Sequence, residues 1–320
     1  MTTRTHANTF THVIHPRRGR FTIGLLNLLM RLTVKSGLGA HIDIAKLRQK
    51  FSQLNRQASP ALLANVRREN VNCNGVAAQW LSPADYRPER VLLYIHGGAF
   101  VAYTPDVYAA MVASWCQGLK TRALLVDYRL APEHPYPYAL EECLATYRWL
   151  LAQGFNAKDI VIAGDSAGGN LVMATLQHIK ADKQPLPSCA VLLSPFLDLT
   201  LSGKSTLSNA SHDPIFTLPF SVAIRDFYAP ADTYSQASVS PLFGDFPGLP
   251  PLLFQVGSTE MLLDDAVRAA TKANASGVPV QLEIWARLPH VFQLMPTLPQ
   301  TQEAVQRIQN FINKYTEWDV

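Results

Sequence analysis

The chain has 320 residues, of which 48% are hydrophobic and 16% are charged, and it carries a formal net charge of +4. This size and composition predict a globular protein with one large apolar core and an appended segment, rather than two separate domains. No dense basic face with interleaved aromatic residues is evident, which argues against a nucleic-acid-binding protein. The cysteines at positions 73, 116, 143 and 189 follow neither zinc-ligand spacing nor a disulfide pattern. We therefore expect reduced thiols, no metal site and no cofactor.

The N-terminal segment is expected to be mostly helical. Residues 1–20 are polar and are predicted to lack regular structure. Residues 21–57 predict two helices divided by a glycine-containing break at 36–39. No apolar stretch reaches the about 18 residues that a membrane span needs, so we expect no membrane insertion and a cytoplasmic protein.

The apolar stretch at 21–30 has three interpretations. It follows several arginines, as in a signal peptide, but Arg31 and Lys35 interrupt it and no cleavage pattern follows. In helical register one face carries Ile23, Leu26, Met30 and Val34, and Leu25, Leu29 and Leu32 widen it. We favour an amphipathic helix of a cap that buries this face; a membrane-surface helix and a secretion signal remain open.

Farther along, strand patterns alternate with helix patterns. Residues 66–71 and 75–81 predict an antiparallel pair of strands. The other predicted strands span 91–95, 122–127, 160–163, 189–193, 251–256 and 280–285, and the predicted helices span 106–119, 138–153, 168–181, 265–275 and 300–315. This alternation is typical of a parallel sheet with helices on both faces. The pattern breaks between 200 and 249, so we divide the chain into a cap segment (1–60), core (61–199), a second cap segment (200–249) and core (250–320).

The segment Gly164-Asp165-Ser166-Ala167-Gly168 lies between an apolar strand and a helix pattern. A Gly-x-Ser-x-Gly sequence in this setting forms a sharp turn that exposes the serine hydroxyl at the edge of a sheet. It predicts Ser166 as a nucleophile.

A second small-residue loop, His96-Gly97-Gly98-Ala99-Phe100, follows the apolar strand at 91–95. Acyl transfer needs backbone N–H groups directed at the oxygen that becomes negative in the tetrahedral intermediate. We predict an oxyanion hole with donors from Gly98, Ala99 and Ala167, and with Gly97 shaping the turn.

The serine needs a base, and in the chain order of α/β-hydrolases the acid and the histidine follow it. Of the later histidines, His178 lies in the helix that leaves the turn and His212 has no strand before it. His290 follows the strand at 280–285 and a short turn, so we predict it as the base. Glu260 is the first carboxylate after the strand at 251–256, so we prefer it as the acid, with Asp264 next.

These segments together resemble the bacterial hormone-sensitive-lipase-like family of carboxylesterases. The matching pieces are HGGAF (96–100), DYRLAPEHPYP (127–137), GDSAGGN (164–170), SPFLDLT (194–200), GSTEMLLDD (257–265) and PHVF (289–292). They occur in the family's order and cover residues 70–320. The resemblance implies an α/β-hydrolase core with a helical cap, which hydrolyses short-chain carboxylic esters.

Two positions depart from the family's pattern. The family usually shows HGGG, and here Ala99 keeps the N–H donor but adds a methyl group near the acyl site. The family's acid is usually an aspartate in a D-P-L segment, where this chain has Glu260-Met261-Leu262. The GSTEMLLDD form resembles the subgroup that includes bacterial acetyl-hydrolases and monoterpene lactone hydrolases.

We therefore expect a serine carboxylesterase that takes a small-molecule ester, with a lactone hydrolase as the alternative. The predicted substrate pocket contains Phe100, Asp165, Phe216, Phe220 and Val291. A non-catalytic receptor is less favoured: the plant gibberellin receptor resembles this family without its histidine, whereas His290 is present here. A homodimer remains open.

Overall fold

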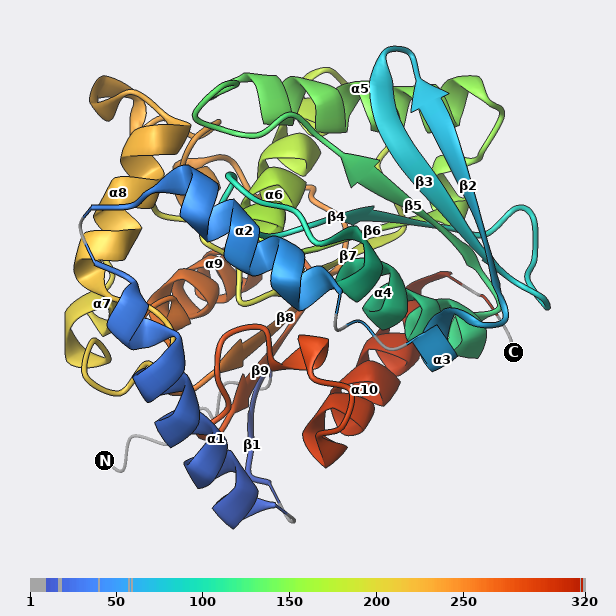
Figure 1. Cartoon of the computed structure of the whole chain (residues 1–320). Coiled ribbons are helices and arrows are strands. Elements are labelled where there is room, and N and C mark those ends of the chain that lie inside the picture. The colour runs from blue at the N-terminus through green and yellow to red at the C-terminus, as the bar shows by residue number, and fades with distance from the viewer. Residues whose placement is uncertain are drawn as a thin grey trace, which may run out of the picture.

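The structure, a computed structural model, describes residues 10–16, 19–39, 41–56, 58, 60–316 and 318. Within them, one nine-stranded sheet has the order β1-β9-β8-β7-β6-β4-β5-β3-β2 (Figure 1). The strands are β1 (Thr11–Ile14), β2 (Val66–Cys73), β3 (Val76–Pro83), β4 (Val91–Ile95), β5 (Arg122–Asp127), β6 (Ile160–Asp165), β7 (Cys189–Leu193), β8 (Leu252–Gly257) and β9 (Val280–Trp285). Only β3 runs antiparallel to its neighbours, β2 and β5, so most of the sheet is parallel, as predicted.

Helices cover both faces of the sheet. The main ones are α4 (Pro105–Leu119), α5 (Tyr138–Ala152), α6 (Ser166–Ala181), α9 (Leu263–Ala275) and α10 (Pro299–Thr316). Alternate residues of a strand point to opposite faces. In β4, Leu93 and Ile95 join the cluster that contains α5, α6 and α9, whereas Leu92 and Tyr94 join the cluster that contains α4 and α10. The predicted arrangement of layers is therefore present.

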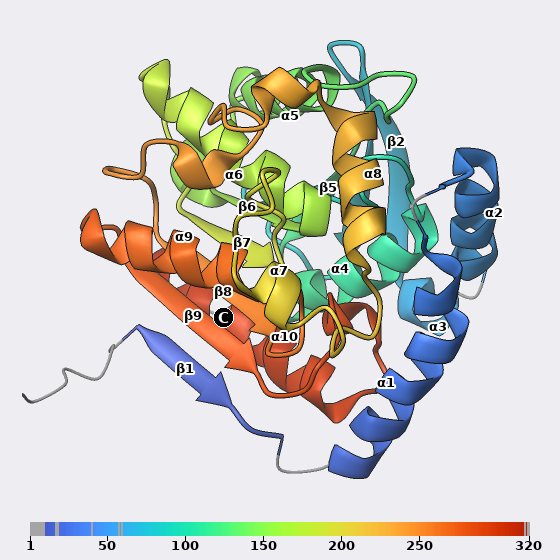
Figure 2. The ribbon, with the colours of Figure 1, turned by 90° about the vertical axis from the view of Figure 1, so that its left-hand side faces the viewer.

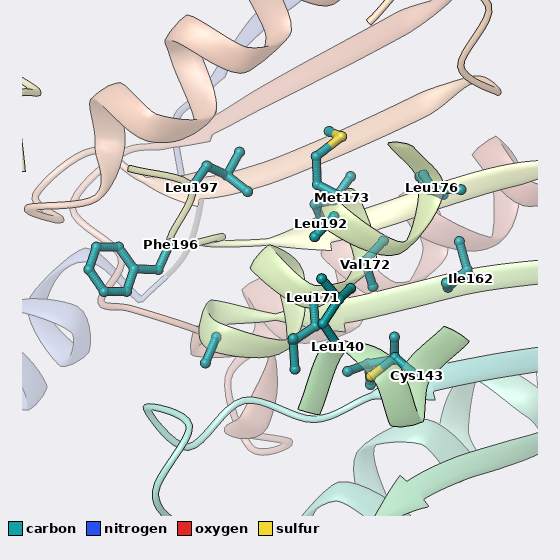
Figure 3. Packing of buried hydrophobic residues seen from close by; sticks show 14 of the residues in the cluster. Leu140, Cys143, Ile162, Leu171, Val172, Met173, Leu176, Leu192, Phe196 and Leu197 are labelled. Atoms are coloured by element: carbon teal, nitrogen blue, oxygen red, sulfur yellow. The ribbon is translucent and has the colours of Figure 1, made fainter. Parts of the chain in front are cut away.

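Helix α6 belongs to the layer that also contains α5 and α9, and its residues are buried without a break from Ser166 to Gln177. Figure 3 shows Leu171, Val172, Met173 and Leu176 of α6 packed among residues of β6, β7 and α5. A helix that is apolar all round is held on every side. The start of α6, where Ser166 lies, is thus fixed by the core.

Two further groups of helices lie outside these layers. The first contains α1 (Arg20–Thr33), η1 (Lys35–Gly37), α2 (Ile44–Asn55) and α3 (Pro60–Leu63), and the second contains α7 (Ser205–Ser208), α8 (Leu218–Tyr228), η3 (Ala231–Thr233) and η4 (Pro241–Phe243). Within the described residues, the other helical segments are the short turns η2 (Ala157–Asp159) and η5 (Phe292–Leu294). The two groups touch, because Thr217 donates a hydrogen bond to the Leu38 carbonyl (2.7 Å).

The prediction that residues 1–20 lack regular structure is wrong for 11–14; residues 1–9, 17 and 18 lie outside the described residues. Strand β1 pairs in parallel with β9, placing Thr11 opposite Leu282 and Ile14 opposite Trp285. Four residues among polar neighbours give almost no local strand signal. Their conformation is set by the free edge of β9, which is distant in sequence.

The prediction that α1 buries an apolar face holds only in part. Ile23 is buried, but Leu26 and Met30 are half-buried and Val34 is exposed. The leucines that were expected to widen this face are exposed as well: Leu25, Leu29 and Leu32. Among the described residues, no helix has both the length and the apolar content to cross a membrane.

Candidate active site

Ser166 lies in a strained turn between β6 and α6. Its φ is 52°, in the left-handed region that is unfavourable for a residue with a side chain. The turn is held by a hydrogen bond from the Phe196 N–H to the Ser166 carbonyl (3.0 Å). A Cβ atom at Gly168 would overlap the carbonyl oxygens of Ile95 and His96, so only glycine lets the turn pack this closely against the end of β4.

The loop after β4 is tightly folded beside this turn. Three successive residues, Gly98, Ala99 and Phe100, have φ values of 99°, 56° and 61°. The N–H groups of Val101 and Ala102 both donate to the Gly98 carbonyl at 3.0 Å. Within the described part of the chain, the N–H groups of Gly98 and Ala99 have no acceptor. They are free to donate to a substrate oxygen.

Ala167 is the second residue of α6 and is buried. The first N–H groups of a helix have no partner within the helix, and the helix dipole makes this end electropositive. The N–H of Ala167 is therefore a third donor next to Ser166.

Asp165 holds the loop after β4 in place through hydrogen bonds. Its Oδ1 accepts hydrogen bonds from the Gly97 N–H and the Tyr94 hydroxyl, and its Oδ2 accepts one from the Tyr108 hydroxyl, all at 2.9 Å. Burial raises the pKa of Asp165 to about 6. Since both oxygens are occupied inside the core, this geometry gives no support to the prediction that Asp165 lines the substrate pocket. Because the Gly97 N–H already donates to Asp165, it is not available to a substrate oxygen, and Gly97 is left with the role of shaping the turn.

His96 is an anchor of the same loop. Its ring stacks between Tyr103 and Tyr128, with centroids 3.9 and 4.1 Å away, and its Nδ1 lies 2.6 Å from the Gly97 carbonyl oxygen. Because the carbonyl can only accept, the proton is on Nδ1. Burial lowers the pKa of His96 to about 3, so the ring is neutral near pH 7.

His290 and Glu260 form a buried hydrogen-bonded pair. Nδ1 of His290 lies 2.8 Å from Oε2 of Glu260. The other carboxylate oxygen, Oε1, accepts hydrogen bonds from the Gly257 N–H (2.5 Å) and the Ser194 hydroxyl (2.7 Å). A carboxylate at Nδ1 holds the proton there and leaves Nε2 as the acceptor. This is the arrangement that a general base needs.

Asp264, the alternative acid, has a different partner. Its Oδ2 accepts a hydrogen bond from the Ser205 N–H (3.0 Å) at the start of α7. Its neighbour Asp265 accepts hydrogen bonds from the N–H groups of Leu197 (2.7 Å) and Asp198 (3.0 Å). Both aspartates therefore tie loops to the start of α9.

Parallel pairing explains why these groups lie at one edge of the sheet. Strands β4, β6, β7, β8 and β9 are neighbours that run in the same direction. The carboxyl end of each strand is followed by one element of the site: in this order, the loop that contains Gly98, then Ser166, Ser194, Glu260 and His290. In open α/β sheets ligands bind at this edge.

One aromatic side chain from the 200–249 segment contacts His290, and a second stacks on the first. The Phe216 ring centroid is 4.5 Å from the imidazole, and Phe220 stacks on Phe216 at 5.7 Å. Phe100, in the loop after β4, instead stacks on Tyr228 at 3.7 Å and is buried. Val291 is buried with a φ of 46°, next to His290. Phe216 is thus beside the candidate base, with Phe220 stacked on it, whereas Phe100 is a packing residue.

Sequence reasoning missed Ser194 and Asp213. The Ser194 hydroxyl donates to Glu260 and accepts from the Val291 N–H (3.3 Å), so it links the acid to the loop that carries the base. The buried Asp213 carboxylate accepts from the N–H groups of Phe216 (2.9 Å) and Met261 (2.8 Å). Ser194 could have been found as the first polar residue after the 189–193 strand. Asp213 precedes a proline in a turn, which is a weak signal.

Within the described residues, no group of three or more His, Cys, Asp or Glu side chains could hold a metal ion.

Comparison with known proteins identifies the family. The family model described as alpha/beta hydrolase fold matches residues 92–294. An esterase of Acinetobacter venetianus is 33% identical over 293 residues, covering 88% of this chain and 93% of that protein. An acetyl-hydrolase of Streptomyces hygroscopicus is 35% identical over 240 residues, covering 75% and 80%.

A solved structure agrees with these relatives. The crystal structure of an esterase from the bacterial hormone-sensitive lipase family superposes with a TM-score of 0.85 at 35% identity, covering 92% of this chain and 98% of that one. The match confirms the predicted fold and the predicted family. The chain belongs to the bacterial hormone-sensitive-lipase family of esterases with the α/β-hydrolase fold.

Proposed function

We propose that the chain is a serine carboxylesterase whose triad is Ser166, His290 and Glu260. The observation that carries the assignment is the buried contact between His290 Nδ1 and Glu260 Oε2 at 2.8 Å, at the sheet edge where Ser166 begins α6. A non-catalytic receptor is not retained, because the chain keeps its histidine and belongs to a family of esterases.

The proposed reaction has two halves. His290 Nε2 takes the proton of the Ser166 hydroxyl as the serine oxygen attacks the ester carbonyl carbon. The N–H groups of Gly98, Ala99 and Ala167 stabilise the oxyanion of the tetrahedral intermediate. His290 then gives the proton to the leaving alcohol, and an acyl-enzyme remains. Water, deprotonated by the same histidine, releases the acid and restores the serine.

The proposed substrate is an ester with a short acyl chain, best at about four to eight carbons, since a full hydrophobic pocket gains nothing from a further methylene. Residues 1–60 and 200–249 act as a cap in this proposal, with Phe216 and Phe220 limiting the space at His290. We place the enzyme in the cytoplasm, where its four buried cysteines stay reduced.

A panel of p-nitrophenyl esters with acyl chains of two to sixteen carbons tests the chain-length proposal. We expect kcat/KM to be highest between four and eight carbons; equal rates on palmitoyl and butyryl esters would refute it. Simple lactones in the same panel test the alternative, a lactone hydrolase. It would be preferred if a lactone exceeded the best linear ester in kcat/KM.

A further inference from the structure

We propose that the outer face of α1 docks on an anionic phospholipid surface. This face, called here the leucine face, consists of Leu25, Leu28, Leu29 and Leu32, which are 50%, 51%, 50% and 65% exposed. Their spacing of three and four residues places them on one side of the helix. Single exposed leucines are common on soluble proteins, but four on one helix face form a continuous apolar stripe.

The leucine face points outward because the opposite face of α1 is fixed to the fold. Ile23 is buried, and the Asn27 side chain donates to the Arg287 carbonyl (2.9 Å). At the C-terminal end, Arg31 donates to the His212 carbonyl (2.7 Å) and Lys35 to the Ala210 carbonyl (2.6 Å). Figures 1 and 2 both show α1 on the outside of the molecule. The exposure is therefore built into the packing of this helix.

Charge distinguishes the N-terminal part of the chain from the rest. Residues 1–42 contain six Lys or Arg and no Asp or Glu. Since the whole chain carries +4, residues 43–320 carry −2. An amphipathic helix with leucines on one face in a basic segment is typical of helices that lie in the membrane interface. Its apolar side enters the headgroup region while basic residues attract anionic lipids.

A second copy of the chain fits this surface less well. The exposed parts of the four leucines together equal about two whole leucine side chains. This area is far below the about 800 Å² that each partner contributes to a stable interface. A two-fold dimer would also place the same basic segment of each copy against the other. Lipid headgroups of opposite charge avoid both problems.

The test uses the full chain and sedimentation with two kinds of vesicle, pure phosphatidylcholine and a mixture with phosphatidylglycerol. We expect at least tenfold tighter binding to the mixed vesicles, and weaker binding as salt rises. Replacing two leucines of the face, Leu28→Gln with Leu32→Gln, should weaken that binding at least tenfold. The matched control is Leu54→Gln on α2, where the leucine is 48% exposed, and binding should stay within twofold.

Three results would overturn the proposal: no binding to mixed vesicles, equal loss in the control variant, or a dimer by light scattering that the double variant dissociates. The last result would assign the leucine face to a second copy. Hydrolysis of a water-soluble ester, measured on each variant, should match the parent and show that the fold is intact. If the parent hydrolyses no ester, the proposed function is refuted. The vesicle experiment is independent of this result and still decides whether the leucine face binds lipid.

Discussion

Replacing Glu260 with glutamine tests the orienting acid without changing the shape of the side chain. Oε1 of Glu260 accepts from Gly257 and Ser194, and Oε2 lies 2.8 Å from Nδ1 of His290. In the glutamine variant the amide oxygen can keep the first two bonds. The amide NH₂ then faces Nδ1 and can only donate, so the imidazole proton moves to Nε2.

The expected loss follows from this change of tautomer. A histidine protonated on Nε2 cannot take the proton of Ser166. In serine hydrolases the corresponding change costs about 10⁴-fold in kcat, or about 5 kcal/mol in the barrier. We expect kcat of the Glu260→Gln variant to fall by that factor with little change in KM. The fold should be retained, because the volume is unchanged and a buried charge is removed.

The assay is hydrolysis of p-nitrophenyl butyrate, with circular dichroism to confirm folding. The control is Asp264→Asn, which weakens a hydrogen bond from the Ser205 N–H (3.0 Å) and leaves His290 untouched. It should keep activity within about tenfold of the parent. The reasoning is refuted if Asp264→Asn loses more activity than Glu260→Gln, or if Glu260→Gln keeps more than about a tenth of the parent rate.

Three further changes test the surroundings of the site. Ala99→Gly removes a side chain from a φ of 56° and should raise the free energy of unfolding by up to about 1 kcal/mol in urea titrations; a decrease would contradict the strain argument. Burial raises the pKa of Asp165 from 3.8 to about 6, so folding favours the protonated carboxyl group. The contribution of Asp165 to the free energy of unfolding therefore falls as pH rises from 4 to 6. The Asp165→Asn side chain cannot ionise, so the free energy of unfolding of this variant relative to the parent should rise by up to about 3 kcal/mol between pH 4 and 7. If the difference between the two free energies of unfolding does not change with pH, a raised pKa is excluded. Phe216→Ala removes a ring 4.5 Å from that of His290 and should raise kcat/KM for octanoyl relative to butyryl esters about tenfold, whereas no shift would place the acyl chain elsewhere.

The sequence predicted those parts of the fold that are specified locally. The apolar strands at 91–95 and 189–193 and the Ser166 turn each lie within a few consecutive residues. Strand β1 was missed because its partner β9 is about 270 residues away in the chain and supplies the reason for its conformation. Periodicity likewise predicted two helices within 21–57 and the face that carries Ile23, but not that Leu29 and Leu32 would stay exposed.

The candidate site could be predicted only as far as chain order allows. Order and spacing favoured Glu260 over Asp264, but the contact with His290 depends on the register of β8 against β9. Asp213 could not be found in this way, since its partner, the Met261 N–H, is 48 residues away and any residue type could supply it. Ser194 follows a predicted strand and could have been found by its position, but its hydrogen bond to Glu260 is 66 residues away in the chain and could not.

The most direct test of the central claim is covalent labelling of the nucleophile. The intact protein is treated with phenylmethanesulfonyl fluoride, and modified peptides are identified by mass spectrometry while ester hydrolysis is followed. We predict one adduct, on Ser166, that forms at the rate at which activity is lost, and none in the Ser166→Ala variant, whose kcat should fall on the order of 10⁶-fold. An adduct on a different residue that accounts for the inactivation, or a Ser166→Ala variant with more than about a hundredth of the parent rate, would contradict the account.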